Sequence, residues 1–168
     1  MNDYSNCKTN KFGEIGEQLF AKLMEQKGYI VESVTDEPIY WEQDIDFILT
    51  NTKTDVKTTF EVKWDSVISS TNNIFFETES NFYGGVKGWG YTSKAQYLAY
   101  GDSHNKAFLV ISFNDIRDFE AETKPYHKTL ADHFNHGMIV RRGALIDIDE
   151  LMDWCRENHR WFMILREN

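Results

Sequence analysis

The chain of 168 residues predicts a single mixed α/β domain. Three features carry this prediction: a helical pattern from Lys11 to Lys27, strand-like segments between residues 29 and 64, and a continuous apolar run from Ala107 to Phe113. Helical and extended segments that follow one another along a chain are typical of domains in which helices pack on a sheet. Later segments are expected to add a helix and a strand at the C-terminal end.

The first helix is predicted by its apolar stripe. Within residues 11–27, apolar or small residues recur every three or four positions, at Phe12, Ile15, Gly16, Leu19, Phe20, Leu23 and Met24. Side chains at this spacing lie on one face of a helix and pack against a core. Gly28 follows the stripe, and because glycine commonly ends helices, we expect this helix to end there.

Three strands are expected next, at Tyr29 to Val34, Ile45 to Thr50 and Thr58 to Trp64. Residues 51–55 between the second and third are polar turn formers, so these two strands should form a hairpin. A further extended segment is expected at residues 73–78.

The second half of the chain shows shorter patterns. Four glycines indicate a loop over residues 80–92, and Thr92 or Ser93 is a suitable N-cap for a short helix over 93–100. The apolar run 107–113 is typical of a buried strand. We expect helices at 114–122, 126–134 and 148–158, and extended segments at 138–146 and 161–165.

Composition narrows the class of protein. Hydrophobic residues make up 41% of the chain, which favours a packed domain over a disordered segment. The sequence contains no apolar run near the roughly 20 residues that span a bilayer, and its first residues lack the features of a signal peptide. We therefore expect a cytoplasmic protein without a membrane partner, with residues 1–10 as a polar tail and 11–168 as one domain.

The net charge of −9 argues against a protein that coats nucleic acid through overall positive charge. It does not exclude an enzyme that meets nucleic acid locally. A bound divalent cation reduces the repulsion between acidic side chains and phosphate.

The expected strand 58–64 carries the residues with the strongest chemical implication. Because side chains alternate along a strand, Glu61, Lys63 and Asp65 share one face. On the preceding strand, Asp46 heads an apolar run, where a charge costs stability unless it has a partner. In a hairpin Asp46 lies near Glu61, and two neighbouring carboxylates repel unless a cation or a proton lies between them. Oxygen ligands of this kind favour a hard cation such as magnesium.

One acid of the first helix is placed to join this group. At about 100° per residue, Glu14 and Glu25 fall opposite the apolar stripe, whereas Glu17 falls at its edge beside Met24. Glu17 is therefore the acid on this helix best placed to reach an interior site.

Glu17 on a helix, Asp46 on a strand and Glu61-Val62-Lys63 on the next strand together resemble the PD-(D/E)XK nuclease superfamily. The expected element order αβββαβ over residues 11–113 resembles it too. The likeness implies a restriction-endonuclease-like αβββαβ core with a C-terminal helix and strand added. It also implies a deoxyribonuclease that depends on Mg²⁺ or Mn²⁺.

The resemblance further implies the roles of the site residues. Asp46, Glu61 and the Val62 carbonyl would hold the metal, and Lys63 would orient or activate the attacking water. Glu17 would hold a second metal, bind metal-bound water or orient Lys63.

Gln43 or Ile45 stands where the family's name places a proline, so Asp44 and Asp46 are both eligible as the ligand. Asp46 is preferred because three apolar residues follow it directly. Asp44, Asp65 and Glu77 are candidates for an outer shell of the site.

A narrower likeness follows the motif. The segments Thr71–Glu77, Gly84–Val86 and Thr92–Tyr97 look like those of small nuclease-like proteins of phages and bacterial mobile elements. This likeness implies a role in phage or mobile-element DNA processing. The loop around it mixes aromatic and cationic side chains, which suits contact with bases and phosphates, although an ordinary surface loop explains them equally well. These candidate DNA contacts are Lys87, Trp89, Tyr91 and Lys94.

Two other functions remain open. One is a catalytically inactive nuclease-like module that binds nucleic acid or a protein partner, which the negative charge favours. The other is a protein-interaction domain of unrelated fold with Trp154 and Trp161 in its interface. That domain predicts that strand 58–64 does not lie next to strand 45–50. Duplex, single-stranded and branched DNA, endonuclease and exonuclease action, and a monomer or a homodimer are all compatible with the sequence.

Overall fold

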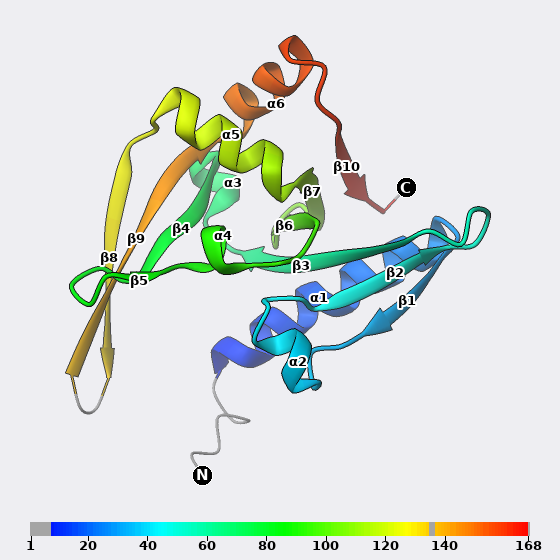
Figure 1. The fold of residues 1–168 in the computed structure, drawn as a ribbon, viewed down its shortest axis with the longest axis horizontal. Coiled ribbons are helices and arrows are strands. Elements are labelled where there is room, and N and C mark those ends of the chain that lie inside the picture. Colours follow the sequence, from blue (N-terminus) through cyan, green and yellow to red (C-terminus); the bar gives the residue numbers. More distant parts are fainter. Residues whose placement is uncertain (1–7, 135–136, 168) are drawn as a thin grey trace.

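The computed structural model describes residues 8–134 and 137–167, which form a mixed α/β arrangement of two sheets and flanking helices (Figure 1). The first sheet is mixed and has the strand order β1-β2-β3-β6-β7-β10. Its strands are β1 (Tyr29–Ser33), β2 (Phe47–Asn51), β3 (Lys57–Asp65), β6 (Tyr97–Asp102), β7 (Ala107–Ser112) and β10 (Phe162–Arg166). The second sheet is antiparallel and has the order β5-β4-β9-β8. Its strands are β4 (Asn73–Asn81), β5 (Val86–Lys87), β8 (His127–Phe134) and β9 (Gly137–Asp147).

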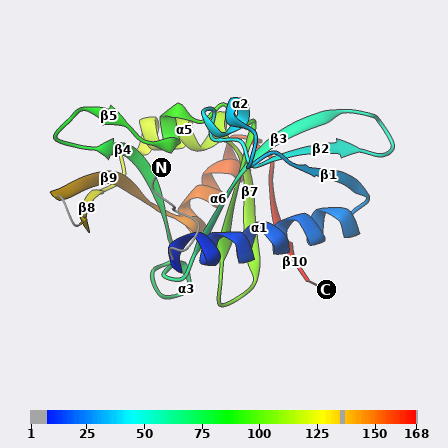
Figure 2. The same cartoon turned by 90° about the horizontal axis from the view of Figure 1, so that it is seen from below.

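The helices differ in length and position. The longer ones are α1 (Lys8–Gln26), α5 (Phe113–Thr123) and α6 (Ile148–Glu157), and the single-turn ones are α2 (Pro38–Trp41), α3 (Ile68–Thr71) and α4 (Trp89–Thr92). Figure 2 shows α1 running beneath the first sheet, with the hairpin of β2 and β3 at one end of the molecule and the second sheet at the other. Within the described residues, every helix is too short or too polar to traverse a lipid bilayer.

The predicted hairpin is confirmed. Strands β2 and β3 are antiparallel with Phe47 opposite Phe60, and the Asn51 amide donates to the Val56 carbonyl at 3.0 Å where the turn closes. The protein-interaction domain of unrelated fold required these strands to lie apart, so its prediction is wrong. On its other side β3 runs parallel to β6, with Glu61 opposite Leu98.

Helix α1 covers one face of the first sheet. Its residues Phe20, Leu23 and Met24 are buried against strand residues that include Phe60 and Val62. A fully buried side chain of this kind contributes about 1.5–3 kcal/mol through the hydrophobic effect. The apolar stripe predicted for α1 is therefore the contact that fixes the helix on the sheet.

A second core fills the space on the opposite face of this sheet. Strands β4 and β9 of the second sheet and helices α5 and α6 contribute to it, through buried residues such as Phe76, Ile146, Phe119 and Leu151. The second sheet is consequently packed to the first through apolar side chains rather than joined to it as a separate unit.

Most predicted elements are confirmed with shifts of a few residues at their ends. These include the first helix, the first three strands, and the elements predicted at 73–78, 107–113, 114–122, 138–146, 148–158 and 161–165. Residues 8–10 of the predicted polar tail belong to α1, and the tail's residues 1–7 lie outside the described part. The predicted loop 80–92 contains β5 and α4.

Two predicted helices are wrong. Residues 97–100 of the predicted helix 93–100 belong to β6, and the predicted helix 126–134 is strand β8. Strand β6 lies between β3 and β7, so its backbone groups bond to two neighbours, and sheet pairing overrides a weak helical pattern. Strand β8 pairs along its length with β9, so this segment is extended.

Candidate active site

A cleft of about 610 Å³ opens where β2 and β3 separate. The Asp46 amide donates to the Phe60 carbonyl at 2.9 Å, just before the first residue pair of the hairpin. Beyond this point β3 continues along β6 alone, so its other edge faces the cleft. All four predicted catalytic residues line the cleft, namely Glu17, Asp46, Glu61 and Lys63, and Val62 lines it as well.

Asp46 compensates for the end of the hairpin. Its carboxylate Oδ2 accepts a hydrogen bond of 2.7 Å from the Val62 amide, which has no partner strand on that side. Burial raises the pKa of the Asp46 carboxyl, and Glu17 adds to the rise, while Lys63 and the Val62 amide counteract it. The acid that precedes the apolar strand β2 therefore has a structural role, because the Asp46 carboxylate supplies the hydrogen-bond acceptor for the Val62 amide of β3.

Glu61 is the most buried acid of the cleft, with 3% of its side chain exposed. Its Oε1 forms an ion pair with Lys63, whereas its Oε2 is buried and has no hydrogen-bond partner among the residues that the structure describes. Burial first, and the Asp46 charge next, raise the pKa of Glu61 to about 7 despite the opposing effect of Lys63. A buried carboxylate oxygen without a hydrogen bond costs free energy, so Glu61 does not stabilise the fold through this atom.

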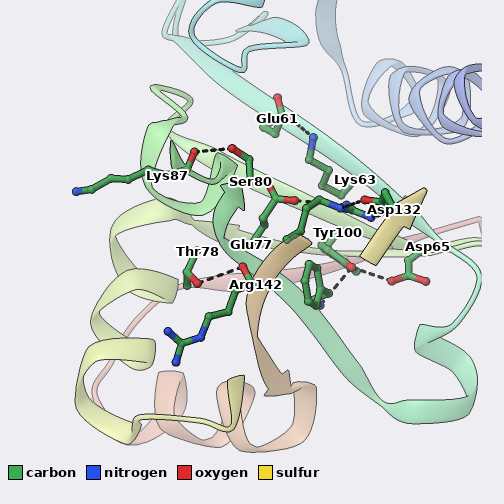
Figure 3. Close-up of polar contacts among 12 residues, drawn as sticks. Glu61, Lys63, Asp65, Glu77, Thr78, Ser80, Lys87, Tyr100, Asp132 and Arg142 are labelled. Carbon is green, nitrogen blue, oxygen red and sulfur yellow. Dashed lines mark hydrogen bonds and ion pairs between the residues drawn. The ribbon is translucent and has the colours of Figure 1, made fainter. Parts of the chain in front are cut away.

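Lys63 extends from the same face of β3 as Glu61 (Figure 3). Burial alone would lower the pKa of its ammonium, but the carboxylates of Glu61 and Asp46 raise it above its usual value. The Nζ atom also lies 5.5 Å from the centroid of the Trp89 ring, within the range of a cation–π contact. Lys63 is therefore held as a cation between an acid and an aromatic ring.

Glu17 reaches the cleft because α1 approaches β3 closely at the preceding residue. A Cβ atom built on Gly16 would lie 2.5 Å from the Trp64 side chain, so only glycine permits this spacing. Burial raises the pKa of the half-buried Glu17 carboxyl, and Glu61 is the next largest cause. The charges of Glu61 and Lys63 on β3 therefore affect the pKa of Glu17 from across the cleft.

The charges of the cleft fit a bound cation. Six acids line it against one lysine, the acids being Glu14, Glu17, Asp36, Asp44, Asp46 and Glu61. Asp46 and Glu61, together with the unpaired Oε2 atom of Glu61, offer the hard oxygen ligands that Mg²⁺ prefers. Across residues 8–134 and 137–167, no three His, Cys, Asp or Glu side chains are grouped closely enough to hold a metal ion. A metal ion in this cleft would therefore need ligands from the backbone, water or substrate besides the carboxylates of Asp46 and Glu61.

The three candidates for an outer shell lie in different places. Asp44 lines the cleft, and its Oδ2 accepts a 2.8 Å hydrogen bond from the Thr92 hydroxyl. Asp65 lies further along β3, where its Oδ2 accepts from the Tyr100 hydroxyl at 2.8 Å (Figure 3). Glu77 is buried on β4, and its Oε2 lies 3.4 Å from Arg141. Only Asp44 of the three belongs to the cleft lining.

Three of the four predicted DNA contacts lie near one another, because the Lys87 Nζ atom is 5.9 Å from the centroid of the Tyr91 ring, and Tyr91 and Lys94 line a common pocket. Trp89 is half-buried, with its ring centroid 5.4 Å from that of Phe76 in the core. The Tyr91 hydroxyl donates to Glu120 at 2.5 Å, while Lys87 and Lys94 are exposed. Trp89 thus packs against Phe76 on one side and lies beside Lys63 on the other.

Sequence reasoning did not place three residues beside the site. Tyr100 on β6 of the first sheet and Arg141 on β9 of the second sheet line a smaller pocket next to Lys63, and Asp36 between β1 and α2 lines the main cleft. Tyr100 was hidden in a segment predicted as helical. For Arg141, the sequence did contain a signal. Side chains alternate along the strand after residue 137, so Arg141 and its neighbour Arg142 lie on opposite faces of the sheet.

Comparisons of the chain with protein-family models, curated proteins and solved structures found no match. The geometry of the cleft is therefore the basis for a functional assignment.

Proposed function

We propose that the chain is a metal-dependent nuclease that hydrolyses DNA phosphodiester bonds. The observation that supports this best is the convergence of Asp46, Glu61 and Lys63 in one cleft, with Glu17 facing them from α1. Carboxylates that hold Mg²⁺ beside a cationic side chain are the groups that phosphodiester hydrolysis needs, because negative charge develops on phosphate oxygens.

The topology around the cleft supports a restriction-endonuclease-like core. Helix α1 packs on a sheet in which the β2–β3 hairpin is followed by a strand parallel to β3. One feature departs from the expected αβββαβ order: the connection from β3 to β6 carries the strands β4 and β5 and two single-turn helices instead of one helix directly before β6. The proposal therefore rests on the site and on the hairpin more than on the complete order of elements.

The residues of the chain have distinct roles in this proposal. Asp46, Glu61 and the Val62 carbonyl hold the metal, which supplies Lewis-acid activation of water and of the phosphate when bound. Lys63 is kept as an ammonium by the neighbouring carboxylates, so it orients the attacking water through a hydrogen bond and stabilises charge on the phosphate. Glu17 orients water at the opposite wall of the cleft or holds a second ion.

The likeness of residues 71–97 to small phage and mobile-element proteins makes DNA processing the expected setting. In this chain Thr92 and Ser93 bind Asp44 at the cleft rim through their hydroxyl groups.

The decisive experiment measures cleavage of supercoiled plasmid, and of single-stranded and branched DNA, with Mg²⁺ or Mn²⁺. We expect Glu61→Gln, Glu61→Ala and Lys63→Ala to lower the rate by about a hundredfold or more. Calorimetric titration with Mn²⁺ alone should show binding to the wild type that Glu61→Gln weakens.

Matched controls come from the same elements. Lys57→Ala removes an exposed lysine of β3, and Glu25→Gln removes an exposed acid of α1, so both should cleave like the wild type. Glu17→Gln, on the same helix as Glu25, should reduce cleavage. Equal cleavage by wild type, Glu61→Ala and Lys63→Ala would identify a contaminating nuclease and contradict the proposal.

The alternative is a catalytically inactive module that binds nucleic acid or a protein partner. The observations that favour it are the net charge of −9 and the lack of a three-residue metal group in the described residues. Binding of DNA without cleavage of any of the three substrate forms would support this alternative.

A further inference from the structure

Lys63 separates the acidic cleft from a second, smaller pocket. This pocket has a volume of about 250 Å³ and lies between the first sheet and the second. Its lining includes Lys63, Phe75, Trp89, Tyr100, Leu130 and Arg141. Both pockets share the edge of β3 at residues 63–64, so a ligand that spans them passes the Lys63 ammonium.

The second sheet contributes two apolar side chains and one arginine to the pocket wall, namely Phe75, Leu130 and Arg141. Leu130 on β8 lies opposite Arg141 on β9, so both side chains project from the same face. The Phe75 ring lies on this face too, over Gly143, where an added Cβ atom would come within 2.7 Å of the ring. The Phe75 ring and the Leu130 side chain offer apolar contacts to a planar ring.

Arg141 adds hydrogen-bond donors to that surface. Its Nε and Nη2 atoms donate to the two carboxylate oxygens of Asp132, at 2.5 and 3.2 Å, and its Nη1 atom lies 3.4 Å from Glu77. Three of the five N–H groups of the guanidinium are used in this way. The side chain is 37% exposed, so the remaining N–H groups are available to a ligand.

The charge balance of the pocket selects the kind of ligand. Arg141 is already neutralised by Asp132 and Glu77, and Lys63 by Glu61. Asp65 adds a further carboxylate to the lining. The pocket therefore does not attract a second phosphate. It suits a neutral planar group with hydrogen-bond acceptors, and its volume is below the roughly 300–1,000 Å³ typical of sites for whole small molecules.

We infer that this pocket binds one nucleobase of the substrate, next to the phosphate that Lys63 contacts. The inference rests on the proposed nuclease function and adds the substrate form to it. A base enters the pocket only when it is unpaired, so the preferred substrate is single-stranded DNA or a frayed end. Stacking on the apolar side chains and hydrogen bonds from Arg141 both contribute to such a contact.

The test is binding of a short labelled single strand, measured by fluorescence anisotropy with Ca²⁺ in place of Mg²⁺. Arg141→Gln should weaken binding about tenfold, whereas Arg142→Gln should change it less than about twofold. Arg142 is a matched control because it is the next residue of β9, is similarly exposed at 39% and pairs with Glu79 on the other face. Leu130→Glu places a charge in the pocket wall from a different strand and should also weaken binding. Thermal melting shows whether each variant is folded.

Strands with one abasic position locate the base. One such position should weaken binding to the wild type as much as Arg141→Gln does, and should have no further effect on that variant. The wild type should bind the single strand more tightly than the same sequence in a duplex.

Several results would overturn the inference: equal binding by folded Arg141→Gln and Arg142→Gln, no effect of any abasic position, or no single-strand binding at all. If the wild type cleaves DNA while binding is insensitive to Arg141, the base pocket is refuted and the nuclease proposal remains. If binding follows the expected pattern but no DNA is cleaved, the pocket is supported and the nuclease proposal is refuted.

Discussion

Strand β3 buries an aromatic side chain on the face toward α1 and a carboxylate on the opposite face, and the two are buried to a similar extent. Phe60 is 5% exposed beneath α1, and Glu61, the next residue, is 3% exposed on the other face. Burial of the phenyl ring stabilises the fold, whereas burial of the carboxylate raises its pKa to about 7 and leaves one oxygen without a partner. Phe60 and Glu61 thus have opposite effects on stability, and the destabilising residue, Glu61, belongs to the candidate site.

The largest expected effect is on the apolar face. Phe60→Ala removes a ring that packs against Phe20 and Tyr97, so it should lower the free energy of unfolding by about 3–5 kcal/mol. Urea denaturation measures this change. Glu25→Ala, at an exposed position of α1, should change it by less than about 0.5 kcal/mol. A loss below about 1 kcal/mol for Phe60→Ala would show that α1 does not seal this face.

Because of the buried Glu61 carboxyl, the stability of the chain should depend on pH. In the folded chain the pKa of Glu61 is about 7, above its ordinary value of 4.5, so the folded state keeps a proton that the unfolded state releases. The stability of the metal-free chain should therefore fall as pH rises from 4.5 to about 7, and remain lower above that. This difference corresponds to roughly 3 kcal/mol at most.

Glu61→Gln cannot release this proton, so its stability should fall less over the same pH range. Denaturation at several pH values in a chelating buffer measures the two curves. Parallel curves for wild type and Glu61→Gln would contradict the account of the charged face.

The contact between α1 and β3 can be tested at a single helix position. Gly16→Ala places a methyl group against Trp64 and should lower the free energy of unfolding by about 1–3 kcal/mol. Gly13→Ala, one turn earlier and with no atom within 4 Å of its added Cβ, should instead raise it by about 0.5–1 kcal/mol. Thermal unfolding of both variants provides the comparison, and a change of the same sign in both would contradict it.

The smallest expected effect separates Asp46 from Asp44. Asp46→Asn keeps an acceptor for the Val62 amide but removes the charge, so Mn²⁺ binding should weaken about tenfold, or roughly 1.4 kcal/mol. Asp44→Asn should weaken it less than about threefold, because the Asp44 carboxylate is engaged by Thr92. Calorimetric titration measures both, and a larger loss for Asp44→Asn would exchange their roles.

The spacing of apolar and polar residues along the sequence predicted the elements that carry the candidate site. The stripe of α1, the β2–β3 hairpin and the alternation of Glu61 and Lys63 follow from local spacing, so Asp46 and Glu17 were placed correctly beside them. The second sheet could not be read in this way. Among the described residues, β8 is an edge strand that pairs with β9. Its mix of polar and apolar residues does not identify it as a strand unless the position of β9 is known.

The strand β6 shows a different limit. Its residues Leu98, Ala99 and Tyr100 are buried although they point alternately to the two faces of the sheet, and such a run shows no alternation of polar and apolar residues that would distinguish a strand from a helix. Tyr100 therefore remained hidden, although its hydroxyl links Asp65 to the backbone amide of Phe75 on the second sheet.

The long connection that brings β9 back to β4 has a consequence for the order of folding. The Asn72 side chain donates to Asp147, 75 positions later in the chain, at the end of the paired strands. Closing so large a loop is entropically slow, whereas the β2–β3 hairpin joins neighbours within a few residues. A chain released from denaturant should therefore form the carboxylate site of Asp46 and Glu61 early. It should enclose Lys63 only in the last step, when the distant strand arrives.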